Sequence, residues 1–286
     1  LDSAMQNLAR KAILQVSATD TAALCGTYPQ VTRRRYAAYA VNDTVAHDTA
    51  MRILLGNIAL CAARHERSIE PLMSVFDGHH TRVSVLVTPG KKNASNVYEN
   101  LGWRVNEPDS KTIAASIKAG WHSFKCSKTP QPRCLLPYNS PPESLADGNV
   151  SGPLWIGPIA REDVLEELTD EYALETCGLS NEKDAHIISL AGWKKEDVER
   201  SNKGIVRSIE RLHQSKDAVG TNGLVTVDEL PQWIEIGGPP SPKKLVDALK
   251  ENGFKAAISS ISTPAIQTNA PWDTMVKIVK EMDDSN

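Results

Sequence analysis

The chain has 286 residues, of which 41% are apolar and 23% are charged, with 17 glycines and 17 prolines. This length and composition are typical of a globular protein with one large domain or two ordinary ones. No run approaches the ~18 consecutive apolar residues of a membrane-spanning helix, so we expect no membrane partner. The net charge of −3 does not by itself support a nucleic-acid partner, and we expect that the protein does not bind DNA.

The cysteines are odd in number and irregularly spaced, which argues against a disulfide framework and indicates a reducing, cytoplasmic compartment. Cys126 and Cys134, with His122 nearby, are weak candidates for zinc ligands. The paired Cys-x-x-Cys of a structural zinc site is missing, however. We therefore expect no zinc, and loop cysteines without metal are the default interpretation. Cys61 falls on an apolar helical face and is expected to be a buried thiol.

The first 90 residues predict helix, strand and helix in that order. Apolar residues at helical spacing predict a helix over Leu1–Lys11, and an apolar run predicts a strand over Ala12–Thr19. A long helix is expected over Asn42–His65, whose apolar stripe predicts packing on a sheet. Between them, Tyr28–Tyr39 is expected to be irregular and basic, because Pro29 prevents an early helix.

A hairpin is expected after the long helix. Asp77-Gly78 separates two β-rich runs, Ile69–Phe76 and Thr81–Val87, and Asp-Gly between strands is a strong hairpin signal. An α/β sheet that ends in an antiparallel hairpin is typical of the last third of a Rossmann-like S-adenosylmethionine methyltransferase domain. A nicotinamide-dependent oxidoreductase, the minor alternative, would more often continue with parallel strands and crossover helices.

Pro89-Gly90 indicates a boundary between a domain over residues 1–90 and an α+β domain over residues 91–286. A loop is expected over Phe124–Gly152, and a non-helical turn over Gly152–Ile159, where two Gly-Pro pairs flank a tryptophan. Helix, helix and strand near the C-terminus suggest a small winged-helix-like unit, which either binds nucleic acid or only packs. The elements expected after the boundary are helices over Lys91–Leu101, Lys111–Ala119, Arg161–Leu179, Glu196–Ser215, Val227–Trp233 and Pro242–Asn252, and a strand over Phe254–Ile258.

The loop Ser17–Gly26 is the main candidate site, because it follows a predicted strand and ligands bind at the carboxyl edge of α/β sheets. Thr19 and Asp20 would lie at the strand tip, and Cys25-Gly26 would close the loop. A turn or helix cap made by the Thr and Asp side chains is the more frequent alternative.

Two further candidates lie nearby in the sequence. Arg33, Arg34 and Arg35 next to Tyr36 combine phosphate-binding charge with a stackable ring, although a solvated basic turn fits equally well. His47, on the long helix, would orient a substrate or support the loop, whereas a helical histidine with a satisfied hydrogen bond is the commoner case. No Gly-x-Gly-x-x-Gly follows a strand, so no cofactor-binding residue is assigned in this chain.

Five stretches together resemble one family, the tRNA guanine N2-dimethyltransferases that modify the guanine at position 26. They occur in the family's order and cover nearly the whole chain. The stretches are Val16–Gly26 (Val-Ser-Ala-Thr-Asp-Thr-Ala-Ala-Leu-Cys-Gly), His47–Leu54 (His-Asp-Thr-Ala-Met-Arg-Ile-Leu), the paired strands of Ile69–Val87, Gly152–Pro158 (Gly-Pro-Leu-Trp-Ile-Gly-Pro) and Thr268–Pro271 (Thr-Asn-Ala-Pro).

The resemblance implies transfer of methyl groups from S-adenosylmethionine to the exocyclic amine of guanine in tRNA, with a C-terminal domain that helps to hold the tRNA. It also implies that Thr19 and Asp20 support catalysis. Cys25, Gly26, Arg33–Arg35 and His47 would face the substrate. The family's proton acceptor is expected in an Asp-Pro-Phe/Tyr-Gly motif just before Leu1. We therefore expect a fragment without the cofactor-binding half, inactive as given.

The chain also departs from the family pattern. The family's paired zinc cysteines reduce to Cys126 and Cys134. Ile258, Ser260 and Gln267 stand where the family usually has Arg, His and Lys, which would weaken phosphate contacts. The alternative that follows is a non-catalytic RNA-binding relative of the family.

Overall fold

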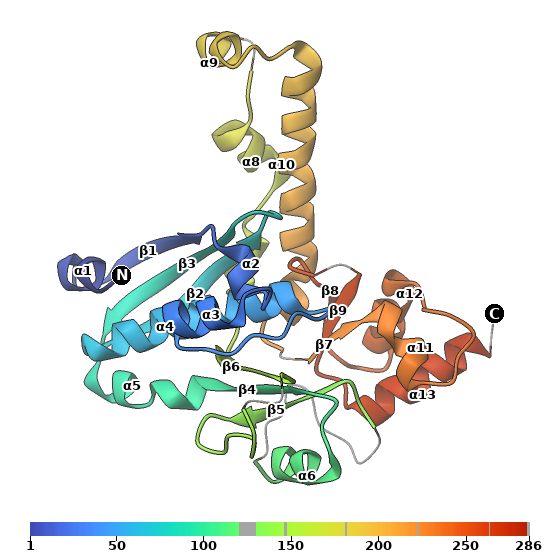
Figure 1. The fold of residues 1–286 in the computed structure, drawn as a ribbon. Helices are drawn as coiled ribbons and strands as arrows, with labels where there is room; N and C mark the ends of the chain where they lie inside the picture. Colours follow the sequence, from blue (N-terminus) through green and yellow to red (C-terminus); the bar gives the residue numbers. More distant parts are fainter. Residues whose placement is uncertain (120–129, 146–147, 181, 222, 263, 285–286) are drawn as a thin grey trace.

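The computed structural model describes residues 1–119, 130–145, 148–180, 182–221, 223–262 and 264–284 (Figure 1). Within these ranges the chain is an α/β protein, as expected, and its named strands form three antiparallel sheets of three strands each. Among the same residues, no helix has both the length and the apolar character needed to cross a membrane.

The first sheet contains the predicted hairpin. Strands β2 (Arg67–Phe76) and β3 (Thr81–Pro89) pair antiparallel, and β1 (Ala12–Ala18) pairs with the other side of β3. Because Thr81 is opposite both Ala18 and Phe76, β1 and β2 end at the same edge of the sheet. The prediction of a hairpin closed by Asp77-Gly78 is confirmed.

Helix α4 (Ala46–Arg64) packs on this sheet and supplies more buried residues to the main core than any other element that the structure describes. Its buried apolar side chains meet the alternating buried valines of β3, as the sequence pattern predicts. The helix begins a few residues later than expected, and Asp43 accepts a hydrogen bond from the backbone N–H of Val45 just before it. The short helix α1 (Asp2–Asn7) covers less of the predicted Leu1–Lys11.

The prediction that Tyr28–Tyr39 is irregular is wrong, because helix α3 occupies Pro29–Tyr36. Pro29 begins this helix rather than preventing it: at the first helical position its missing N–H costs nothing. The short helix α2 (Thr21–Leu24) precedes α3, and the Thr32 hydroxyl of α3 donates a hydrogen bond to the Ala23 carbonyl of α2.

The second sheet lies in a region where we expected a helix and a loop. Its order is β5 (Arg133–Pro137), β4 (Leu101–Asn106) and β6 (Val150–Trp155). The predicted helix Lys91–Leu101 is therefore wrong beyond α5 (Lys91–Ser95), which a 3-10 turn separates from β4. The predicted loop Phe124–Gly152 likewise contains β5 and the start of β6, while its residues 124–129 and 146–147 lie outside the described residues.

The Gly-Pro-Leu-Trp stretch forms an edge strand and not only a turn. Its backbone pairs with β4, and a turn follows in which the Trp155 indole N–H donates to the Pro158 carbonyl at 2.8 Å. Gly152 has a φ of +137°, and a Cβ there would lie 2.7 Å from the Gly102 carbonyl oxygen. Only glycine fits this close approach of two backbones. The helix predicted over Lys111–Ala119 is confirmed as α6 (Ser110–Ala119).

A helical arm stands out from the body of the molecule (Figure 1). The prediction of one helix over Arg161–Leu179 is wrong, because Thr169 accepts a hydrogen bond from Tyr172 N–H and begins a separate helix. The predicted helix over Glu196–Ser215 is confirmed as α10 and spans the length of the arm. The arm consists of α8 (Asp170–Cys177), α9 (Ala185–Leu190) and α10 (Lys195–Ser215), and α7 (Glu162–Glu166) packs against β2 at its base.

The C-terminal unit has the expected helix, helix and strand, with two more strands and a last helix that the sequence pattern did not predict. Three strands form its sheet in the order β7, β9, β8, and the helices pack around a separate apolar core. The indole N–H of Trp272 donates to the Pro130 carbonyl at 2.9 Å, which attaches this unit to the second sheet. The elements are β7 (Gly223–Thr226), α11 (Leu230–Trp233), α12 (Pro242–Glu251), β8 (Ala256–Ile258), β9 (Ala265–Thr268) and α13 (Trp272–Asp283).

A buried ionic network joins the first two sheets through α4. Asp48 accepts hydrogen bonds from Arg52 at 2.8 Å and from Arg104 of β4 at 2.5 Å. Arg52 also donates to the carbonyls of Trp155 and Gly157, at 3.2 and 3.3 Å. Burial opposes the charge of Asp48, but the two guanidinium groups outweigh it and hold the pKa of Asp48 below its usual range.

A second network joins three segments of the chain around Arg133 of β5. Its guanidinium binds both carboxylate oxygens of Glu229, at 2.5 and 2.8 Å, and the hydroxyl of Thr44 at 2.7 Å. Asp43 lies 3.4 Å away. Burial opposes the charge of Arg133, yet the Glu229 carboxylate raises the pKa of Arg133. The segment before α4 is thereby tied to the second sheet and to the C-terminal unit. The domain boundary at residue 90 stays a prediction.

Removing the buried carboxylate would leave two arginines uncompensated. We expect Asp48→Asn to lower the free energy of unfolding by about 3–5 kcal/mol, the usual cost of removing one partner from a buried ion pair. Urea unfolding measures this loss. Glu281→Gln, which removes an exposed ion pair with Lys277, is the control and should leave the midpoint nearly unchanged. Equal midpoints for the two variants would contradict the role of the network.

Candidate functional site

The sheet edge at which β1 and β2 end gathers most of the residues predicted from the sequence. Thr19 and Asp20 follow β1, and His47 lies in the first turn of α4. The neighbouring strand spacing of about 4.8 Å puts the ends of β1 and β2 roughly 10 Å apart, with β3 between them. Thr19 is exposed at this edge.

Asp20 attaches helix α3 to the end of β1. Its carboxylate accepts hydrogen bonds from Tyr36 at 2.5 Å and from Arg35 at 2.9 Å. Burial alone would raise the pKa of Asp20, but these two hydrogen bonds outweigh it and hold the pKa below its usual range. Asp20 is therefore ionised near neutral pH and engaged by α3, which suits a positioning residue better than a proton acceptor.

Cys25 and Gly26 close the loop from the inside of the protein. Cys25 is buried, and burial with the nearby charge of Asp43 raises the pKa of its thiol to about 11, so it is not a nucleophile at neutral pH. Gly26 has a φ of +85°, and a Cβ there would lie 2.7–2.8 Å from backbone atoms of Ala40, Val41 and Asn42. Both residues hold the loop in shape.

The three arginines lie in the last turns of α3 and have different surroundings. Arg35 is paired with Asp20, and the guanidinium of Arg33 lies 4.8 Å from the ring centroid of Tyr39. Arg34 is exposed and forms no ion pair with any residue that the structure describes. All three positions are exposed, and Arg34 is the one of the three with neither an ion pair nor an aromatic contact among the described residues.

A cleft of about 430 Å³ opens beside His47, and we call it the edge cleft. The His47 ring stacks on Phe76 with centroids 4.1 Å apart and planes inclined by 24°. Partial burial lowers the pKa of His47, so its imidazole is neutral at pH 7. The cleft is lined by His47 and Phe76 at the ends of α4 and β2, by Ser208 and Arg211 of α10, and by Ser260 and Ile261 after β8.

The sequence analysis missed Phe76, Arg211 and Ser260 as members of this site. Phe76 ends a predicted strand, and Arg211 is one of several cations on a polar helix, so neither had a local motif to identify it. Ser260 appeared only as a departure from the family pattern. The other two departures do not line the cleft: Gln267 is 1% exposed within β9, and Ile258 is a partly buried residue of β8.

The structure describes one of the two weak candidates for zinc ligands. Cys134 is buried in β5, and Cys126 lies outside the described residues. One other trio in the described part of the chain is close enough to share a metal ion: Asp2, Cys61 and His65, whose ligand atoms lie within 4.8 Å of one another.

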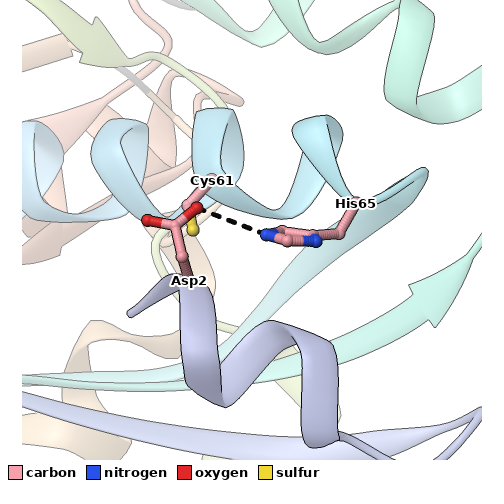
Figure 2. A group of neighbouring side chains, drawn as sticks. All are labelled: Asp2, Cys61 and His65. Carbon is pink, nitrogen blue, oxygen red and sulfur yellow. Dashed lines mark hydrogen bonds and ion pairs between the residues drawn. The ribbon is translucent and has the colours of Figure 1, made fainter.

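Figure 2 shows the Asp2 carboxylate of α1 facing the His65 ring, with the Cys61 sulfur beside it. His65 and Arg64 already bind this carboxylate at 3.2 and 3.3 Å. Burial and the neighbouring Asp2 raise the pKa of the Cys61 thiol, which keeps its proton. These contacts account for the docking of α1 onto α4 without a metal.

Comparisons with known proteins agree on one family. A family model for N2,N2-dimethylguanosine tRNA methyltransferase matches residues 1–280. The tRNA (guanine(26)-N(2))-dimethyltransferase of Pyrococcus furiosus is 26% identical over 284 residues, which are 98% of this chain and 61% of that protein. The protein of the same name from Methanobrevibacter smithii is 28% identical over 294 residues, which cover 100% of this chain and 64% of that protein.

A solved structure shares the fold. It is the complex of Trm1 from Pyrococcus horikoshii with S-adenosyl-L-methionine, with a TM-score of 0.71 and 22% sequence identity. The similarity covers 97% of this chain and 61% of that chain. The chain thus spans about three fifths of the length of the relatives that it matches.

The hydrogen bonds of Asp20 make a pH-dependent contribution to stability. We expect Asp20→Asn to lower the free energy of unfolding by about 1 kcal/mol at pH 7, since the exposed Arg35 is screened by solvent and Tyr36 contributes most. The pKa of Asp20 is lower in the folded state, so this stabilisation is complete well above the unfolded value of about 3.9. The difference from the wild type should shrink as the pH falls below that value, which urea unfolding at several pH values measures. A difference that grows in acid would contradict this account.

Gly26 has a matched control in the hairpin turn. Gly26→Ala should destabilise the protein by about 2–3 kcal/mol, because the positive φ is strained for alanine and its Cβ meets backbone. Gly78 has a similar φ of +89° but nothing within 4 Å of its Cβ position, so Gly78→Ala should cost only about 1 kcal/mol. Thermal unfolding compares the two variants. Equal losses of stability in the two variants would show that the backbone contacts around Gly26 do not add to the cost of the Gly26→Ala substitution.

Proposed function

Because this chain belongs to the N2,N2-dimethylguanosine tRNA methyltransferase family, we propose that the protein transfers methyl groups from S-adenosylmethionine to the N2 amine of guanine 26 in tRNA. The family match over residues 1–280 carries this proposal. The printed names of the relatives and the bound S-adenosyl-L-methionine of the Pyrococcus horikoshii structure support it. The alternative is a relative that binds RNA without catalysis.

The chemistry of the reaction sets what the site must provide. The lone pair of an exocyclic amine on an aromatic ring is delocalised, so the amine is a poor nucleophile. Its methylation requires close alignment with the methyl donor and a group that accepts the amine proton. S-adenosylmethionine supplies the activated methyl group when bound.

We assign the residues at the sheet edge to the substrate side of such a site. At the sheet edge, the Asp20 carboxylate is held by Tyr36 and Arg35, so it is not free to bind the hydroxyl groups of a cofactor. The space beside the Gly26 Cα is occupied by the backbone of residues 40–42, which leaves no room there for a cofactor. We therefore assign neither Asp20 nor Gly26 to S-adenosylmethionine.

We assign the substrate contacts as follows. Thr19 and the neutral His47 present polar groups at the edge, and the His47–Phe76 stack offers an aromatic wall for a base. Asp20, Cys25 and Gly26 keep the loop in position. The exposed arginines of α3, with Arg34 free of ion pairs among the described residues, bind phosphates of the tRNA.

Methyl transfer by the full-length protein tests the proposal. A tRNA transcript incubated with labelled S-adenosylmethionine should acquire label on guanine. Absence of transfer would contradict the enzymatic function, and tRNA binding without transfer would support the RNA-binding alternative.

His79, in the hairpin turn between β2 and β3, provides a matched control for His47. We expect His47→Ala to lower kcat/KM for tRNA at least about 10-fold, because it removes half of the stack that lines the edge cleft. His79→Ala changes an exposed turn residue and should leave kcat/KM unchanged. Steady-state methylation measures both variants. Equal activity of His47→Ala and the wild type would contradict the assignment of His47 to the substrate site.

A further inference from the structure

We propose that the arm helix α10 binds the phosphate backbone of the RNA substrate along a stripe of four cations, Arg200, Lys203, Arg207 and Arg211, which we call the arm stripe. The inner end of this stripe opens into the edge cleft. This inference rests on the proposed function and assigns the surface that positions the substrate.

The stripe follows from helical geometry. Lys203, Arg207 and Arg211 are four residues apart, and Arg200 precedes Lys203 by three, so all four lie on one face of the helix. Each of the four positions is exposed. Gly204 and Ser208, which lie beside these cations on the same helix, are small and leave the face open to a bulky ligand.

The opposite face of α10 holds the arm together. The Asn202 side chain accepts a hydrogen bond from Leu179 N–H and donates one to the Leu179 carbonyl, both at 2.9 Å. Val198 and Leu212 are buried on the helix. At about 100° per residue, Asn202 is roughly 140° around the helix from Arg207, so the stripe faces away from these contacts.

Three members of the stripe lack an ionic partner. Lys203, Arg207 and Arg211 form no ion pair with any residue in the described ranges, whereas Arg200 lies 3.6 Å from Asp197. Some other surface cations are neutralised locally, such as Lys250 by Asp217 at 2.6 Å. Exposed glutamates at positions 196, 199 and 210 lie on or beside this face, but the inner part of the stripe, from Lys203 to Arg211, holds three cations and one of these glutamates. In a chain of net charge −3, this local excess of cations without ion-pair partners indicates an anionic partner.

The length and direction of the stripe fit a nucleic-acid strand. From Lys203 to Arg211 it extends about 12 Å at 1.5 Å per residue, which matches the axial rise of about three nucleotides at roughly 3.4 Å each. Arg211 lines the edge cleft together with His47 and Phe76. A strand bound along the arm therefore reaches the cleft at the edge where we place the target base.

Salt-dependent binding of tRNA to the full-length protein tests this surface. The triple variant K203Q/R207Q/R211Q should weaken tRNA binding roughly 10- to 100-fold at low salt. It should also make the slope of log Kobs against log salt shallower by about 2, because each neutralised phosphate contributes about 0.7–0.9 to that slope. Replacement of Arg207 and Arg211 by lysine keeps the charges and should preserve the slope.

The control is Lys195→Gln, which changes an exposed cation of the same helix that is paired with Glu199. It should leave both affinity and slope unchanged, and circular dichroism should show all variants folded, since every change is at an exposed position. If the wild type binds and methylates tRNA but the triple variant has the same slope of log Kobs against log salt, the proposal that the arm stripe binds phosphates is overturned while the proposed function stands. Failure of the wild type to bind tRNA would instead overturn the proposed function.

Discussion

The architecture of this chain depends on the buried carboxylate of Asp48. It neutralises Arg52 on its own helix and Arg104 on a strand of the second sheet, and Arg52 in turn binds two carbonyls of the Gly-Pro-Leu-Trp turn. A buried ion group of this kind contributes less to net stability than its contacts suggest, because desolvation opposes it. Its value lies in specificity: the charges are satisfied in one relative placement of α4 and the second sheet.

That placement determines the sheet edge where we locate the substrate. His47 directly precedes Asp48, so the network that fixes the first turn of α4 also fixes the ring that stacks on Phe76. The Arg133–Glu229 pair then holds the C-terminal unit against the segment before α4. Ser260 of that unit lines the same cleft as His47. The cleft is thus assembled from segments far apart in the sequence by two ionic networks.

Local patterns in the sequence predicted the hairpin, α4, α10 and α12, because each depends on short-range periodicity, turn residues or caps. They did not predict β4 and β5, whose apolar runs have no alternation to distinguish them from a short helix or a loop. Pro29 was misread because proline both prevents and begins helices, depending on its position. The partners of Asp48 and the members of the edge cleft depend on tertiary packing, which a single sequence does not encode in any local pattern.

The most direct test of this account is a photo-crosslink from the target base itself. A tRNA with 6-thioguanosine at position 26, bound to the full-length protein and irradiated, carries its probe to whatever surrounds that base. Mass spectrometry of the digested protein should locate the crosslinks at the edge cleft, on peptides that contain His47 or Phe76, or on the loop Ser17–Gly26. Crosslinks confined to the second sheet or to the C-terminal unit beyond residue 264 would contradict the assignment of the substrate edge.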